Sequence, residues 1–186
     1  MSTPKTGTLV LVRHAEATGQ SPTATLTEAG MGAAERLADF LSDYPVDFIA
    51  TSRMARARQT IEPYASRTGL PIHQDHRLNE RILSTEPITN WREIVRRSFD
   101  DPDLHAPGGE SGAQVLYRAQ AALEGIFERG HAMPLVVTHG NLMALLLHAA
   151  DATFGYPGWQ ALGNPDVYLL SRLADGSRRF QSVWRP

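Results

Sequence analysis

The sequence contains no cysteine, no long hydrophobic run and no excess of charge of either sign. The absence of cysteine excludes disulfides, thiolate catalysis and cysteine-based zinc sites. The longest apolar stretch, residues 142–150, includes His148 and is much shorter than the roughly 18 apolar residues that a spanning helix needs. The four apolar residues before Arg13 are too few for the core of a signal peptide. We therefore expect a cytoplasmic protein.

The charge balance gives the molecule as a whole no preference for a highly charged partner. The 18 Lys and Arg residues nearly balance the 20 Asp and Glu residues, which gives a formal net charge of −2. We therefore expect neither a nucleic acid nor a membrane partner, and any anion site must be local. Hydrophobic residues make up 42% and charged residues 20%, as in globular proteins. The 186 residues predict a single domain, 1–186.

Short apolar runs alternate with amphipathic segments along most of the chain. The expected strands are 8–12, 46–51, 70–73 and 135–138, and the expected helices are 27–41, 52–64, 90–99, 111–129 and a segment from 141. Residues 167–173 and 178–184 flank a turn signal and predict a hairpin. This order predicts an α/β fold, a three-layer α/β/α sandwich with a mostly parallel central sheet and a C-terminal hairpin addition.

Local signals set several of the expected helix ends. Ser52 is placed to cap the second helix, and Pro63 is expected to shorten or bend it. Ser111 and Gln114 form a capping-box pattern at the start of the helix that Gly130 ends.

Arginine and histidine follow three of the expected strands. Arg13 and His14 come directly after the first strand, Arg56 lies in the helix after the second, and His139 follows the fourth. Carboxyl ends of parallel strands meet at one edge of a sheet, so these side chains are expected to lie together. Guanidinium groups match phosphate oxygens in bidentate geometry, and a neutral histidine nitrogen can attack phosphorus. The pattern predicts a phosphoryl-transfer site.

A leaving alcohol needs a proton, and Glu80 after the third strand is the candidate general acid. Glu80 could instead simply pair with a nearby arginine. His73 and His76 have a spacing that a metal-ligand pair could use, but no nearby carboxylate pattern supports a metal site.

Six motifs, taken in order, resemble those of the histidine phosphatase superfamily, the phosphoglycerate-mutase-like proteins. A single Arg-His pair would be weak evidence for this resemblance, whereas six elements in the family's order are specific evidence for it. The six elements cover about residues 8–145. They are Leu11-Val12-Arg13-His14-Ala15-Glu16, Leu26-Thr27-Glu28-Ala29-Gly30, Ser52-Arg53-Met54-Ala55-Arg56-Ala57-Arg58-Gln59-Thr60, Arg77-Leu78-Asn79-Glu80, Gly109-Glu110-Ser111 and Val137-Thr138-His139-Gly140.

The resemblance implies a role for each matching residue. His14 would carry the phosphoryl group, and Arg13, Arg56 and His139 would bind it. Glu80 would act as the acid and then as the base that activates water. No metal or organic cofactor is implied.

The sequence departs from the family pattern outside this phosphate core. Gln20 stands where mutases commonly have an asparagine that contacts phosphate, which makes it a candidate phosphate-binding residue. Ala15, Ala17 and Ala33 replace residues that are more usual there, and Arg81-Ile82-Leu83 replaces a glycine-containing stretch. The outer substrate shell is therefore expected to differ from the standard one, with 81–110 as an insertion that covers the substrate.

Three functions fit these features. The first is a metal-independent phosphomonoesterase, similar to histidine acid phosphatases, that hydrolyses a small phosphorylated substrate through phosphohistidine on His14. The second is a phosphoglycerate mutase or related phosphomutase, although mutases of this family are generally longer than this chain. The third is a catalytically silent protein that binds phosphorylated ligands, which the presence of His14 disfavours.

Overall fold

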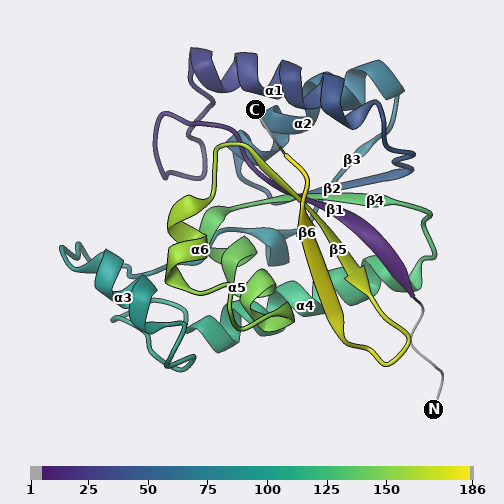
Figure 1. Ribbon diagram of the computed structural model, residues 1–186. Coiled ribbons are helices and arrows are strands. Elements are labelled where there is room, and N and C mark those ends of the chain that lie inside the picture. Colours follow the sequence, from purple (N-terminus) through teal and green to yellow (C-terminus); the bar gives the residue numbers. More distant parts are fainter. Residues whose placement is uncertain (1–5, 185–186) are drawn as a thin grey trace.

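A six-stranded sheet with helices on both faces forms the centre of the computed structural model, which describes residues 6–184 (Figure 1). The strands follow the order β3-β2-β4-β1-β5-β6. Four of them pair in parallel: β1 (Gly7–Arg13), β2 (Phe48–Thr51), β3 (Ile72–Gln74) and β4 (Pro134–Thr138). The other two, β5 (Asp166–Arg172) and β6 (Arg178–Ser182), form the antiparallel hairpin at one side. Residues 1–5, part of the segment compared above with a signal peptide, and residues 185–186 lie outside the described residues.

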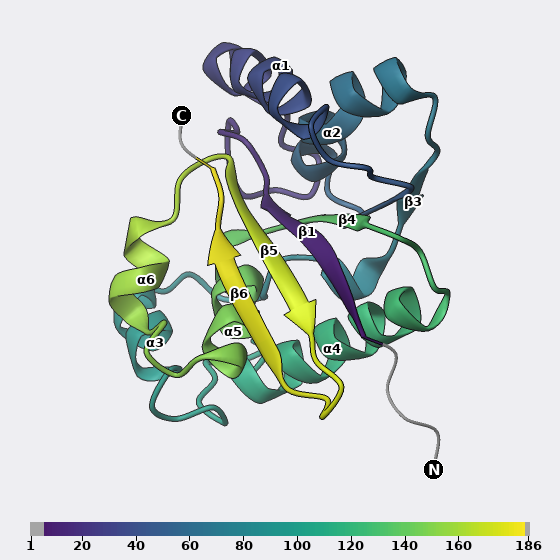
Figure 2. The same cartoon turned by 45° about the vertical axis from the view of Figure 1, so that its right-hand side comes forward.

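The helices form the two outer layers and a cap beside one sheet edge. Figures 1 and 2 show α1 and α2 over one face, α4 and α5 over the other, and α3 and α6 together at one side of the molecule. Their bounds are α1 (Glu28–Leu41), α2 (Ala55–Thr68), α3 (Trp91–Arg97), α4 (Gly112–Glu128), α5 (Gly140–Ala150) and α6 (Tyr156–Ala161), with a 3₁₀ turn, η1 (His76–Leu78). The expected three-layer sandwich with a C-terminal hairpin is confirmed.

Strand β1 is apolar throughout its centre because both of its faces are covered. Val10 and Val12 pack in the cluster under α1 and α2, whereas Leu9 and Leu11 pack in the cluster under α4 and α5. Successive side chains of a strand point to opposite faces, so a strand between two helical layers has no polar face.

The expected start of the second helix was wrong, and Pro63 does not shorten the helix. Helix α2 begins after Met54, and Ser52 does not cap it, because the Ser52 hydroxyl contacts a buried histidine instead. Pro63 lies inside α2, which continues to Thr68 and ends at Gly69 with φ of 72°. Packing of the α2 face against the core compensates for the N–H that the proline lacks.

Other helix ends follow the sequence signals. The Thr27 hydroxyl accepts from the Gly30 amide at the start of α1, and Ser111 with Gln114 forms the capping box of α4. Helix α6 was not expected, since it has only six residues. Within residues 6–184, no helix combines the length and the apolar character needed to cross a membrane.

Candidate active site

The candidate residues gather at the carboxyl ends of three parallel strands. Arg13 ends β1 and pairs in register with Thr138, the last residue of β4, and the His14 amide donates to the Thr138 carbonyl (3.0 Å). The next residue, His139, precedes α5, and its ring centroid lies 5.0 Å from that of His14. Residues some 125 positions apart in sequence therefore lie beside each other at the sheet edge where α3 and α6 also lie (Figure 2).

Hydrogen bonds on both ring nitrogens fix the tautomer of His14. Its Nδ1 lies 2.6 Å from the carbonyl oxygen of Ala15, which can only accept, so Nδ1 carries the proton. Its Nε2 accepts from Nε of Arg56 at 3.2 Å. The Nε2 lone pair is therefore directed at the guanidinium group of Arg56, and this hydrogen bond has to break before Nε2 can bond to another atom.

Burial keeps both histidines neutral. Burial is the main cause that lowers the pKa of His14 to about 3; the bond to Ala15 opposes this shift, and the charges of Arg56 and Arg13 add to it. Burial also lowers the pKa of His139 well below its usual value, with nearby positive charge as a further cause. A neutral imidazole is the form of histidine that can act as a nucleophile.

The loop between β1 and α1 holds the guanidinium group of Arg56. Its Nη1 donates to the carbonyls of Gln20 (3.3 Å) and Ser21 (3.0 Å), while its Nε reaches His14. Gln20 thus contributes a backbone oxygen to the position of Arg56, and its side chain is exposed at the cavity.

Backbone carbonyls hold the guanidinium group of Arg13 in the same way. Its Nη1 donates to the carbonyls of Leu162 (2.7 Å) and Gly163 (3.2 Å), which follow α6. Its Nε is buried and has no protein partner within the described residues. Because buried donors normally have partners, this N–H is an available donor for a bound oxyanion.

His139 is fully buried behind the cavity wall, and the Ser52 hydroxyl orients its ring. The Ser52 oxygen lies 2.7 Å from Nε2 of His139 and also accepts from the Met54 amide. When the hydroxyl donates its proton to Nε2, the histidine proton is on Nδ1. That Nδ1 is buried and has no partner among the described residues, so in this tautomer it is a second available donor.

Glu80 is anchored at the N-terminus of α5. Its carboxylate oxygens accept from the amides of Asn141 (3.0 Å), Leu142 (3.1 Å) and Arg81 (2.9 Å). The first-turn amides of a helix are unpaired within the helix and favour a negative group. These bonds place a carboxyl group near Arg13 and Arg56, but Glu80 forms no ion pair with an arginine among the residues that the structure describes.

These groups surround one cavity of about 680 Å³. Arg13, His14, Gln20, Arg56 and Glu80 all line it, whereas His139 does not. Residues of the predicted covering segment 81–110 form another part of its wall, namely Arg81, Ile82, Leu83, Ser84, Ile88, Trp91 and Val95.

Sequence reasoning missed two residues that position His14 and its neighbour Ala15. The Thr60 hydroxyl accepts from the Ala15 amide (2.9 Å), and the Asn164 amide group donates to the His14 carbonyl (2.8 Å). Thr60 belongs to one of the six motifs, so its place in that motif was the available signal. Asn164 lies outside all six motifs, and no local sequence pattern indicated it.

Glycine is required where two of the motifs meet. A Cβ atom on Gly30 would lie 2.1 Å from the carbonyl oxygen of Glu16, so the start of α1 can approach the loop after His14 only with glycine there. The Thr27 and Glu16 side chains hydrogen-bond across the same contact at 2.8 Å.

Two arginines, two histidines and a carboxyl group lie together at this end of the sheet. Such a set of groups is typical of sites that transfer a phosphoryl group. Comparison with known proteins gives the family: a model of the histidine phosphatase superfamily (branch 1) matches residues 9–181. The chain belongs to this superfamily.

The proteins that this chain resembles include one named as a probable phosphoglycerate mutase and one named as a phosphatase. A probable phosphoglycerate mutase GpmB from Proteus mirabilis is 31% identical over 168 residues, 80% of this chain and 75% of the relative. The structure of a mycobacterial glucosyl-3-phosphoglycerate phosphatase with inorganic phosphate is 26% identical, with a TM-score of 0.75 and 96% of each chain covered. Bacillus stearothermophilus YhfR is 27% identical, with a TM-score of 0.73, and the match covers 95% of this chain and 96% of YhfR.

Proposed function

We propose that this protein is a phosphomonoesterase that hydrolyses small phosphate esters through a phosphohistidine intermediate on His14. The observation that carries the proposal is the state of His14: its proton is on Nδ1, its ring is neutral, and its Nε2 lies 3.2 Å from the Arg56 guanidinium. This state supports the proposal, because a neutral imidazole nitrogen close to positive charge is preorganised for reaction with a phosphate ester.

In the first step, Nε2 of His14 attacks phosphorus and the bond from phosphorus to the alcohol oxygen breaks. Arg13 and Arg56 bind the equatorial oxygens. Donation of the unpaired Nδ1 hydrogen of His139 to one of these oxygens requires the buried ring to move toward the cavity, which it does not line. The bond from Nδ1 of His14 to the Ala15 carbonyl stabilises the positive charge that develops on the ring. Glu80 gives its proton to the departing alkoxide.

In the second step, Glu80 removes a proton from water, and the resulting hydroxide attacks phosphorus. The bond between phosphorus and Nε2 breaks, which releases inorganic phosphate and restores neutral His14. The step needs water to reach the cavity once the alcohol has left, and we propose that segment 81–110 covers the substrate during the first step.

A phosphomutase is the second candidate function, and the names of the curated relatives favour it. It would share the first step, and a second hydroxyl instead of water would accept the phosphoryl group. The two candidates therefore differ in the acceptor and not in the nucleophile.

Competition between acceptors tests the proposal. The protein is mixed with an alkyl phosphate, with and without 3-phosphoglycerate, and both inorganic phosphate and bisphosphoglycerate are followed over time. We expect inorganic phosphate as the product in both cases, and none above background from His14→Ala. Transfer to 3-phosphoglycerate in place of release would establish the mutase, and full activity in His14→Ala would refute the phosphohistidine mechanism.

A further inference from the structure

Beyond the phosphate-binding end, the cavity wall is mainly apolar. Aliphatic and aromatic side chains from four segments far apart in sequence contribute to it: Pro22, Met54, Ile82, Leu83, Ile88, Trp91, Val95 and Trp159. A wall of this kind gains free energy from contact with apolar surface and provides few partners for hydroxyl or carboxylate groups.

Two tryptophans from different helices meet at this wall. Trp91 begins α3 and Trp159 lies in α6, and their rings contact edge to face with centroids 6.1 Å apart. Tyr156 stacks on Trp159 at 5.3 Å, which fixes the plane of that ring. Figures 1 and 2 both place α3 and α6 side by side, so the aromatic pair joins the covering segment to α6.

The arginines of this wall leave no free cation for a second anionic group on the substrate. Among the described residues that line the cavity, the arginines are Arg13, Arg56 and Arg81. The first two are at the phosphate end. Arg81 is only 4% exposed, and its guanidinium donates to Ser98 Oγ (2.7 Å) and to the carbonyls of Leu104 (3.0 Å) and Glu110 (2.9 Å).

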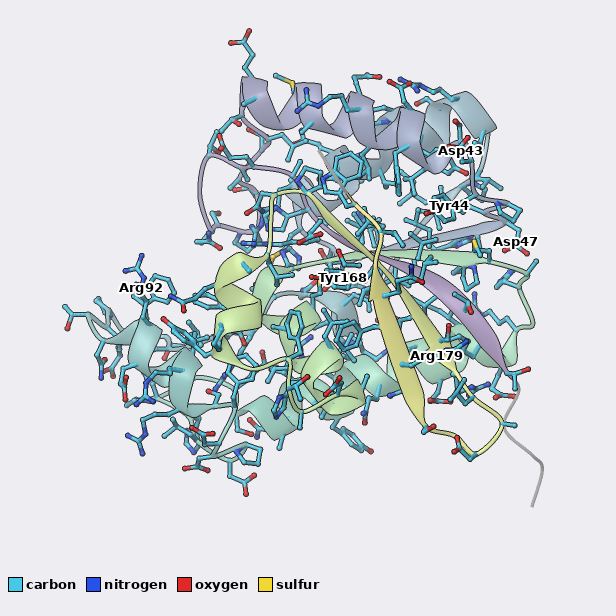
Figure 3. All side chains as sticks on the ribbon, viewed as in Figure 1. Asp43, Tyr44, Asp47, Arg92, Tyr168 and Arg179 are labelled. Carbon is cyan, nitrogen blue, oxygen red and sulfur yellow. The ribbon has the colours of Figure 1, made fainter. Side chains whose placement is uncertain are left out.

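Arg92 lies close to the wall but outside it. Its guanidinium stacks on Trp91 at 4.4 Å from the ring centroid, and it is not among the residues that line the cavity. Figure 3 shows Arg92 on α3 at the periphery of the molecule. The cavity is also lined by the carboxylate of Glu16, which repels a second negative group.

We infer that this cavity selects phosphomonoesters of apolar alcohols that carry an aromatic ring, and that it discriminates against alcohols that carry a carboxylate. The inference rests on the proposed phosphatase function and narrows its substrate class. A carboxylate in this cavity would lose water without gaining a cationic partner, whereas an aromatic ring can pack on Trp91 and Trp159.

Three esters of primary alcohols test this selectivity, because their leaving groups are chemically alike: benzyl phosphate, glycerol 3-phosphate and 3-phosphoglycerate. We expect kcat/KM for benzyl phosphate to exceed that for 3-phosphoglycerate by at least about tenfold. Trp91→Ala and Trp159→Ala should each lower kcat/KM for benzyl phosphate about five- to tenfold, mainly through KM. The same variants should change kcat/KM for glycerol 3-phosphate by less than about twofold.

Two controls separate selectivity from folding and from turnover. Tyr117→Ala removes an aromatic ring that is 80% exposed and does not line the cavity. This variant should leave kcat/KM unchanged for all three esters. Inhibition by inorganic phosphate should stay unchanged in the tryptophan variants if the phosphate end is intact. Calorimetric binding of the same three esters to His14→Asn should show the same preference without any turnover.

The outcomes are distinct. Equal or better use of 3-phosphoglycerate, or equal losses on all esters in the tryptophan variants with unchanged inhibition by phosphate, would overturn the selectivity. Absence of hydrolysis of every ester would refute the phosphatase proposal instead, and the calorimetric comparison would still decide whether the cavity prefers the aromatic ligand.

Discussion

The low pKa of His14 makes folding stability depend on pH in a way that one substitution can isolate. An unfolded histidine binds a proton as the pH falls through about 6.5, whereas His14 in the folded protein does so only near pH 3. The unfolded state therefore binds more protons over this range, so the free energy of unfolding falls as the pH falls from about 6.5 toward 3. His14→Gln removes this titration and retains a neutral polar side chain.

The size of the effect follows from the two pKa values. At pH 5, which is about 1.5 units below the pKa of an unfolded histidine, protonation of residue 14 stabilises the unfolded chain by about 2 kcal/mol. The folded chain does not gain this free energy, because its His14 stays neutral at pH 5. Because His14 is only 7% exposed, solvent screening reduces this little. Between pH 7 and pH 5, the wild type should thus lose about 2 kcal/mol more unfolding free energy than His14→Gln.

Urea unfolding at both pH values, in buffer without phosphate or another anion that fills the site, measures this difference directly. Thermal unfolding should show the same effect as an extra loss of about 4–8 °C in the wild type. An identical pH dependence in the two proteins would refute the reasoning, since it would mean that folding does not suppress protonation of His14.

Two further substitutions test residues that affect the site indirectly, by holding another side chain or a loop in place. Ser52→Ala should lower kcat/KM about ten- to hundredfold in steady-state assays, because it removes the hydroxyl that orients the ring of His139; unchanged kinetics would count against that role. Arg81→Met should lower the free energy of unfolding by about 2–4 kcal/mol in urea titrations, because it leaves the carbonyls of Leu104 and Glu110 without their donor. A stability within about 0.5 kcal/mol of the wild type would show that Arg81 does not hold segment 81–110 in place.

Much of the fold could be predicted because its signals are local. The apolar run of β1, the capping box of α4 and the Thr27 cap of α1 depend on residues within one element or one turn. The convergence of Arg13, Arg56 and His139 also followed from the sequence, because strand ends in a parallel sheet lie at one edge.

The remainder depends on contacts that no local pattern encodes. Ser52 has the sequence context of a helix cap, yet its hydroxyl contacts His139, 87 positions away. Arg81 stood out only as a departure from the family pattern, whereas in the structure it binds a loop 17 to 29 residues further on. Asn164 reaches the His14 carbonyl across 150 positions.

The central claim is that His14 carries the phosphoryl group during turnover. The most direct test is to mix the wild-type protein with benzyl phosphate, quench within milliseconds at alkaline pH to preserve a phosphoramidate, and locate the modification by tandem mass spectrometry. We predict a transient phosphate on His14 that disappears as inorganic phosphate is released. Hydrolysis without this adduct, or an adduct confined to another residue, would contradict the account.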